Sequence, residues 1–198
     1  MTNVIGSFSE ISDKYTAVIC DLWGCLHNGV NSFPEALKAL EDFKVSNGKV
    51  VLVTNAPRPI ANVEYQIASL GIKESHYDML LTSGELTSEY IKKISENKLS
   101  VFHIGGKRHH SIYKQMIHEK KISIEIDNVA QADLLVCTEP FNPSKDQLSD
   151  YDKTFQVGVE KDLTLLCANP DLVVDVGEKR EMCAGSLALM YEGMGGKV

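Results

Sequence analysis

One stretch near the N-terminus constrains the fold most: an apolar run, residues 17–20, that ends on the carboxylate of Asp21. The run predicts a short buried strand, and Gly24 and the pair Asn28-Gly29 then break the chain into a loop. A charge at the end of a buried strand is costly unless something pairs with it, and ligands of open α/β sheets bind at that end. Asp21 is therefore a candidate for chemistry, and the alternative is an Asp that starts the turn.

The segments after this loop alternate between strand and helix patterns. Apolar runs at 50–53 and 79–81 predict two further strands, and apolar residues at helical spacing predict a helix between successive strands. Thr82-Ser83 followed by Glu85 is typical of the start of another helix. Strands that alternate with helices indicate βαβ units, and hence a parallel sheet with right-handed crossovers.

A second set of strands and helices begins near residue 83. Its predicted strands are residues 101–104, 134–137 and 163–167, of which 134–137 is expected to be buried. The last of them leads into a polar turn, Asn169-Pro170-Asp171, and a final helix is expected over 185–194. Because the pattern restarts, we expect two domains, residues 1–82 and residues 83–198.

Charge and hydropathy exclude several classes of protein. A net charge of -7 argues against a protein that binds a nucleic-acid backbone, so Lys107-Arg108-His109-His110 is interpreted as a solvated helix face, with nucleic-acid contact as a minor alternative. No apolar stretch approaches the ~20 residues that a membrane span needs, and residues 1–14 lack the apolar core of a signal peptide. The five cysteines are scattered without metal-binding spacing. We therefore expect a cytoplasmic protein without nucleic-acid or membrane partners.

Three polar strand ends are candidate sites: Asp21, Thr54-Asn55 and Asn169-Pro170-Asp171. The first two follow successive parallel strands, so they can converge on one ligand. An aspartate can attack phosphorus and form an aspartyl-phosphate when a divalent cation screens the charge repulsion. Thr54 could then donate a hydrogen bond to a phosphoryl oxygen. For Thr54-Asn55 taken alone, capping of the strand-to-loop turn is the alternative.

Taken together, these residues resemble a known family, the haloacid dehalogenase-like hydrolases. The family's first two motifs are similar to Asp21-Leu22-Trp23-Gly24, with Leu26 and Gly29 after it, and to Leu52-Val53-Thr54-Asn55. Asn169-Pro170-Asp171 and Gly185-Ser186-Leu187 resemble segments of the class IIA, nitrophenylphosphatase-like branch, in which an α/β cap is inserted between the second and third motifs. The similarity covers nearly the whole chain in order.

The resemblance implies an α/β protein with a partial Rossmann-like parallel-sheet core and an inserted α/β cap domain. It also implies a Mg²⁺-dependent phosphohydrolase that acts on a small phosphorylated metabolite. Asp21 would be the nucleophile and a metal ligand, and Trp23 would give its backbone carbonyl to the metal. Thr54 would bind the transferring phosphoryl group, and Asn55 and Arg58 would line the substrate entrance. The cap would close over the site and set its selectivity.

One departure from the family pattern concerns the general acid. Most family phosphatases have a second Asp two residues after the nucleophile, and this chain has Trp23 there. General acid–base help is worth about 10²–10⁴-fold, so slow turnover is expected unless another group substitutes. His27 is the nearest titratable candidate, although a His in such a loop is more often a hydrogen-bonding spacer.

A second departure concerns the third and fourth motifs, a Lys and a set of acidic residues that should follow the cap. The sequence reaches Lys197 and Val198 about where the cap would return to the core. We therefore expect a truncated or partial core, with the strand that carries Asp21 left as an apolar sheet edge open to homo-oligomer contact.

The sequence leaves open whether the chain is an enzyme. The competing interpretation is a non-catalytic module that binds phosphorylated ligands or another protein. A dinucleotide-binding oxidoreductase is excluded because the loop after Asp21 lacks G-x-G-x-x-G, and a P-loop NTPase because neither Lys107 nor Lys197 is followed by Ser or Thr.

Overall fold

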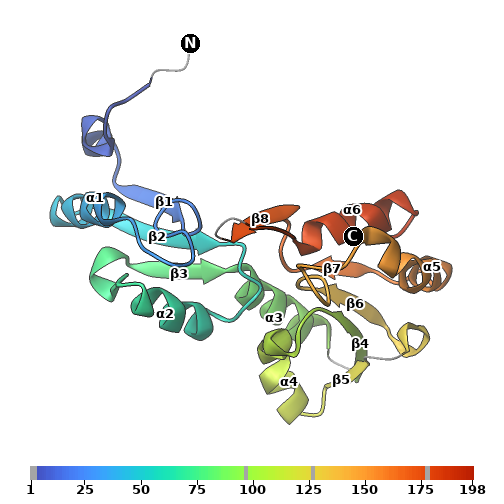
Figure 1. The fold of residues 1–198 in the computed structure, drawn as a ribbon. Coiled ribbons are helices and arrows are strands. Elements are labelled where there is room, and N and C mark those ends of the chain that lie inside the picture. Colours follow the sequence, from blue (N-terminus) through green and yellow to red (C-terminus); the bar gives the residue numbers. More distant parts are fainter. Residues whose placement is uncertain (1–3, 96–97, 126–127, 177–178) are drawn as a thin grey trace. The chain divides into compact units, whose positions relative to one another are not determined.

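The computed structural model describes residues 4–95, 98–125, 128–176 and 179–198. Its α-helices are α1 (Pro34–Val45), α2 (Ile60–Ser69), α3 (Ser83–Ile94), α4 (Lys114–His118), α5 (Asp152–Glu160) and α6 (Ala184–Gly193) (Figure 1). The strands are β1 (Ala17–Asp21), β2 (Lys49–Thr54), β3 (Met79–Thr82), β4 (Leu99–Ile104), β5 (Ile122–Glu125), β6 (Leu134–Cys137), β7 (Leu165–Cys167), β8 (Val173–Val176) and β9 (Lys179–Met182). Short 3₁₀ helices are η1 (Phe8–Glu10), η2 (Ser12–Lys14), η3 (Glu74–His76), η4 (Lys107–Tyr113), η5 (Val129–Gln131) and η6 (Leu148–Tyr151). No helix in these ranges is both long and apolar enough to cross a membrane.

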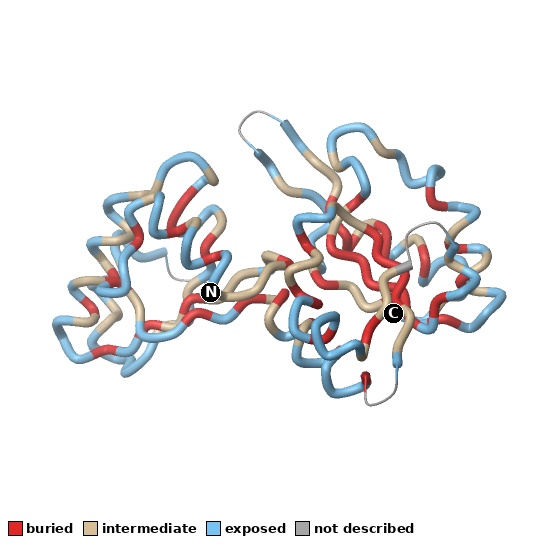
Figure 2. The backbone as a smooth tube through the Cα atoms, turned by 90° about the horizontal axis from the view of Figure 1, so that it is seen from below, coloured by how far each residue is buried: buried red, intermediate tan, exposed pale blue. Residues whose placement is uncertain are grey.

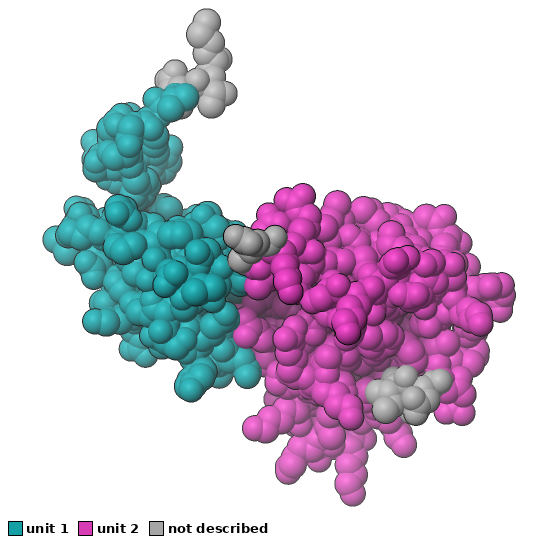
Figure 3. Space-filling model, in the orientation of Figure 1, with its two compact units in different colours: residues 1–54, 60–81 teal, residues 55–59, 82–198 magenta. Residues whose placement is uncertain are grey.

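The chain forms two compact units (Figure 3). The first unit consists of residues 1–54 and 60–81, and the second of residues 55–59 and 82–198. The segment 55–59, which the sequence groups with the first domain, thus lies in the second unit.

The first unit is built on a three-stranded sheet of order β1-β2-β3. Strands β1 and β2 are parallel, and their register pairs Asp21 with Val53. The centre of the unit is β2, in which Val50 and Leu52 are fully buried. Helix α1 adds Leu40 and Phe43 to this core, as the helical spacing of its apolar residues predicts.

The prediction that residues 17–20 form a buried strand is wrong. Among the described residues β1 is an edge strand, its residues alternate between exposed and half-buried, and Ile19 is 73% exposed. The cause lies in topology: an apolar run fixes a strand, but the number of neighbours that the strand receives depends on the rest of the sheet.

The second unit is built on a four-stranded parallel sheet of order β5-β4-β6-β7. All four residues of β6 are buried, and successive side chains point to opposite faces. Leu135 and Cys137 pack with Phe155 of α5 and Leu187 of α6, whereas the other face packs against α3, η4 and α4. Helices therefore cover both faces, and Figure 2 shows the buried residues concentrated in these strands.

Two details of the second unit bear on the sequence predictions. Thr82 caps α3 as predicted, because its hydroxyl oxygen accepts a hydrogen bond from the Glu85 amide at 3.0 Å. The antiparallel hairpin β8–β9 has no counterpart in the prediction. Its residues are mostly exposed, so they lack the buried apolar run that identifies the parallel strands.

Candidate functional site

Asp21 and Thr54 end two adjacent parallel strands of the first unit. Because Asp21 pairs with Val53, Thr54 lies one residue beyond that pair on the neighbouring strand. Neighbouring strands lie about 4.8 Å apart, so the two side chains share the carboxyl edge of the sheet. Asp21 is exposed and Thr54 is half-buried. The carboxylate Oδ1 of Asp21 accepts a hydrogen bond from the Leu22 amide at 2.8 Å, which fixes its orientation at the strand end.

The loop after Asp21 is anchored by apolar side chains and closed by backbone hydrogen bonds. Leu22 and Leu26 are buried, at 2% and 1% exposed, and the amide of Leu26 donates to the carbonyl of Leu22 at 2.9 Å. Gly29 has φ +88°, and a Cβ there would lie 2.5 Å from the indole ring of Trp23. The close approach to Trp23 therefore requires glycine, both for its φ and for the lack of a side chain.

His27 is a structural member of this loop. It is 3% exposed, and its Nδ1 accepts a hydrogen bond from the Gly29 amide at 2.9 Å. Its ring also contacts the Trp23 ring edge-on, with the ring centroids 5.4 Å apart. These contacts favour the hydrogen-bonding spacer over the general acid.

The oxygen donors at the strand end suit a hard cation. Mg²⁺ is commonly held by one or two carboxylates together with waters and substrate phosphate oxygens, and Asp21 supplies an exposed carboxylate. No cluster of three or more His, Cys, Asp or Glu side chains able to hold a metal ion exists among the described residues. A cation at this edge would thus rest on Asp21, the Trp23 carbonyl, water and the ligand itself.

Asn55 and Arg58 belong to the second unit. The side-chain amide of Asn55 donates to Oδ1 of Asp171 at 2.9 Å. The turn that carries Asp171 is itself held by α6, because the Gly185 amide donates to the Asp171 carbonyl and a Cβ on Gly185 would lie 2.2 Å from the carbonyl oxygen of Pro170. The segments around Asp171 and Gly185, quoted above for the family resemblance, are therefore in direct contact.

Arg58 is fixed through its backbone by the start of α3. Its carbonyl accepts a hydrogen bond from the Thr82 hydroxyl at 2.7 Å, and a Cβ on Gly84 would lie 2.1 Å from the Arg58 nitrogen. Burial lowers the pKa of the Arg58 guanidinium, and the positive charge of Arg108 lowers it further, while Glu139 acts in the opposite direction. The charges of Arg108 and Glu139 thus act electrostatically on the Arg58 guanidinium.

The interpretation of residues 107–110 as a solvated helix face holds for Lys107 and Arg108, which are exposed, and is wrong for His109. These residues form the first part of η4, and His109 is 4% exposed with its Nδ1 2.9 Å from the Thr138 hydroxyl. Arg108 forms a two-point ion pair with Glu139, with its Nε 3.1 Å from Oε1 and its Nη2 bonded to Oε2. The charge partner comes from a loop 31 residues away, which a local sequence pattern does not contain.

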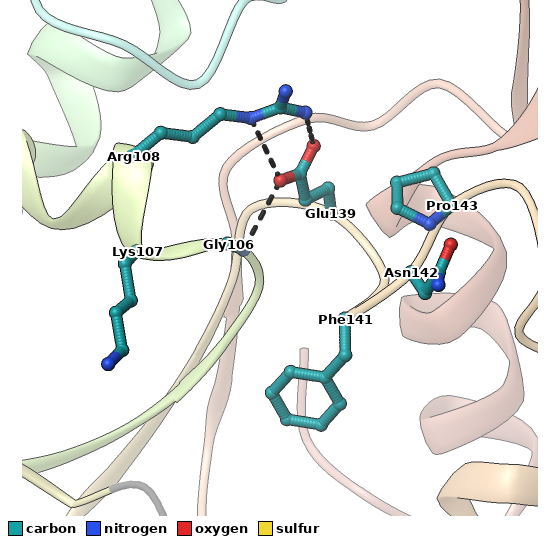
Figure 4. A pocket seen from close by; sticks show the side chains of 7 residues that line it. All are labelled: Gly106, Lys107, Arg108, Glu139, Phe141, Asn142 and Pro143. Atoms are coloured by element: carbon teal, nitrogen blue, oxygen red, sulfur yellow. Dashed lines mark hydrogen bonds and ion pairs between the residues drawn. The ribbon is translucent and has the colours of Figure 1, made fainter.

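Sequence reasoning also missed a hollow that these residues help to form (Figure 4). It has a volume of about 320 Å³. It is lined by Gly106, Lys107, Arg108, Glu139, Phe141, Asn142 and Pro143. The available signal was the position of polar residues directly after two buried strands, 101–104 and 134–137.

Comparison with known proteins shows which family the chain resembles. The family model of haloacid dehalogenase-like hydrolases matches residues 18–117. A crystal structure of a haloacid dehalogenase-like hydrolase from Brucella suis is 35% identical to this chain, covers 96% of it and superposes with a TM-score of 0.84. The chain covers 69% of that protein. The comparison with curated proteins gives no match.

More distant structures share the fold. A 4-nitrophenylphosphatase from Thermotoga maritima is 19% identical, with 92% of this chain and 66% of that one covered and a TM-score of 0.66. A glycerol phosphate phosphatase from Mycobacterium tuberculosis, solved in complex with calcium, is 15% identical, with 92% of this chain and 51% of that one covered and a TM-score of 0.64.

Proposed function

Because the chain belongs to the haloacid dehalogenase-like hydrolases, we propose that it is a Mg²⁺-dependent phosphohydrolase acting on a small phosphorylated metabolite. The observation that carries the proposal is the register of β1 and β2, which sets Asp21 beside Val53 and Thr54 one residue further on. A carboxylate and a hydroxyl at the same sheet edge suit a nucleophile next to a phosphoryl-binding group.

In the proposed reaction a carboxylate oxygen of Asp21 attacks phosphorus, and the bond between phosphorus and the leaving oxygen breaks. Water then cleaves the aspartyl-phosphate and releases inorganic phosphate, which restores the carboxylate. Thr54 donates a hydrogen bond to a phosphoryl oxygen during the transfer. Mg²⁺, held by the Asp21 carboxylate and the Trp23 carbonyl, would screen the repulsion between carboxylate and phosphate.

Residues of the second unit are proposed to select the substrate. Asn55 directly follows Thr54 in sequence, and Arg58 comes three residues after Asn55. Both are held in place within the second unit, Asn55 through Asp171 and Arg58 through Thr82. In this scheme the second unit acts as the cap, and its Asn55 amide and Arg58 guanidinium contact the substrate.

The test is release of phosphate from 4-nitrophenyl phosphate by the purified chain, with Mg²⁺ and with a chelator. Asp21→Asn removes the nucleophile and is expected to reduce release to the uncatalysed background. Asp13→Asn, a change at an exposed carboxylate of η2, is the matched control and should leave the rate unchanged. Release that persists in Asp21→Asn or in the chelator would refute the proposal.

A second candidate function is binding of a phosphorylated ligand without turnover. Trp23 favours it, because an indole at the position of the family's general acid cannot transfer a proton to the leaving group. In that case neither the wild type nor Asp21→Asn releases phosphate from 4-nitrophenyl phosphate. Asp21→Asn then binds inorganic phosphate at least as tightly as the wild type, because the negative charge that repels phosphate is gone.

A further inference from the structure

The hollow of the second unit lies where its sheet favours ligand binding. In the order β5-β4-β6-β7, strand β5 lies on one side of β4 and strand β6 on the other. The direction in which successive strands are added to the sheet therefore reverses at β4. In parallel α/β sheets ligands bind outside the carboxyl ends of the strands at such a reversal. The hollow is lined by residues 106–108, which follow β4, and residues 139–143, which follow β6, so it lies at the reversal.

The negative charge in the hollow is already compensated. Glu139, with a side chain only 14% exposed, accepts hydrogen bonds from Arg108 through both carboxylate oxygens and from the Gly106 amide at 3.2 Å. Lys107 is exposed and makes no hydrogen bond or ion pair with the residues that the structure describes. The charge that remains available to a ligand is therefore the ammonium group of Lys107 (Figure 4).

Phe141 provides a fixed aromatic surface in the same hollow. Its ring stacks on Tyr151, with centroids 5.7 Å apart and an interplanar angle of 11°. The Tyr151 hydroxyl accepts a hydrogen bond from the Phe141 amide at 2.7 Å and donates one to Asp146 at 2.5 Å. Tyr151 thus supports both the backbone and the ring of Phe141, yet Phe141 remains 50% exposed. A half-exposed ring held from one side presents its other face to a ligand.

We propose that this hollow binds a planar aromatic compound that carries an anionic group, with the anion beside Lys107 and the ring on the open face of Phe141. Because a cation and an exposed ring both line this hollow, they can recognise the two parts of such a ligand separately. The site lies wholly within the second unit, so it does not depend on Asp21 or on the proposed hydrolysis.

The experiment compares benzoate with cyclohexanecarboxylate, which has the same charge and number of carbon atoms but no planar ring. Binding to the full chain is measured by ligand-observed NMR. Benzoate is expected to bind at least five-fold more tightly, the lower end of the range for stacking on a protein aromatic ring. Lys107→Ala is expected to weaken both ligands by up to about five-fold, and less at high salt, because a single exposed ion pair contributes little.

Two variants test the ring. Phe141→Leu keeps an apolar side chain and Phe141→Ala removes it, and both should abolish the preference for benzoate. Leu148→Ala and Lys153→Ala change exposed residues of η6 and α5 outside the hollow and should change nothing. The proposal is overturned if the wild type shows no preference for benzoate, or if the preference survives in Phe141→Leu with binding unaffected in Lys107→Ala.

The same measurement on Asp21→Asn separates this site from the proposed hydrolase. Benzoate binding that depends on Phe141 and Lys107 in a chain without phosphatase activity would support the hollow and refute the hydrolase. Phosphatase activity in a chain without benzoate binding would do the reverse.

Discussion

The hydroxyl of Thr82 connects two segments of the second unit, and its removal gives the sharpest test of the fold. Thr82 is 1% exposed, donates a hydrogen bond to the Arg58 carbonyl at 2.7 Å, and accepts one from the Glu85 amide at 3.0 Å. Thr82→Val replaces the hydroxyl with a methyl group of similar size, so packing is kept while both hydrogen bonds are lost. A lost N-cap costs about 1 kcal/mol, and the second hydrogen bond contributes about 1 kcal/mol more.

We therefore expect Thr82→Val to lower the free energy of unfolding by about 2 kcal/mol, measured by urea denaturation followed by circular dichroism. For a chain of this length the melting temperature should fall by roughly 4–8 °C. Thr82→Ser is the matched control, because it keeps both hydrogen bonds and loses one methyl group, which costs about 0.8 kcal/mol. The reasoning is refuted if Thr82→Val stays within about 0.5 kcal/mol of the wild type, or if Thr82→Ser is equally destabilising.

Three further predictions concern the loop, the buried histidines and the candidate site. Gly29→Ala should destabilise the chain in urea by at least about 1 kcal/mol more than Gly24→Ala, because both glycines have positive φ but only at Gly29 would a Cβ meet another side chain; equal losses would contradict this. Burial lowers the pKa of His103 from 6.5 to about 3, so between these pH values the unfolded chain binds a proton that the folded chain does not. The free energy of unfolding should therefore decrease as the pH is lowered from 6.5 to about 3, by up to about 1.4 kcal/mol per pH unit. An equally steep decrease in His103→Gln would argue against this. Asp171→Ala should raise KM for 4-nitrophenyl phosphate, and the double variant with Asn55→Ala should be no worse than Asn55→Ala alone, since Asp171 acts through its hydrogen bond to Asn55; additive effects would show that the two residues act separately.

Local patterns predicted the elements that depend on local physics. The apolar run 134–137 is a fully buried strand, and the hydroxyl of Thr82 caps the helix that begins at Ser83. In both cases the signal and its physical cause lie within a few residues of each other. The same is true of Asp21 and Thr54, whose position at strand ends follows from where each apolar run stops.

The failures share a dependence on distant segments. Ile19 is 73% exposed because β1 is an edge strand among the described residues; the apolar run alone predicts burial, and only the family resemblance leads us to expect the edge. His109 is buried although it lies in a run of basic residues. Its ring nitrogen is hydrogen-bonded to the hydroxyl of Thr138, which is 29 residues away in sequence. The partner of Asn55 is 116 residues away. Composition and periodicity hold no information on such pairs, so the ion pair between Arg108 and Glu139 in the hollow could not be predicted from the sequence.

The loop around Trp23 implies a preference among substrates if the proposed hydrolysis occurs. His27 is only 3% exposed, which keeps its ring away from the leaving group, and Trp23 has no transferable proton, so we expect neither to supply the acid that assists a poor leaving group. Such assistance is worth about 10²–10⁴-fold, and a substrate that needs it loses that factor. An aryl phosphate such as 4-nitrophenyl phosphate leaves as a stabilised anion and needs little assistance, whereas an alkyl phosphate leaves as a strongly basic alkoxide. The rate constant should therefore fall steeply as the leaving group becomes more basic across a series of aryl and alkyl phosphates. A flat dependence would mean that a proton donor does act at the site, and would refute this reasoning.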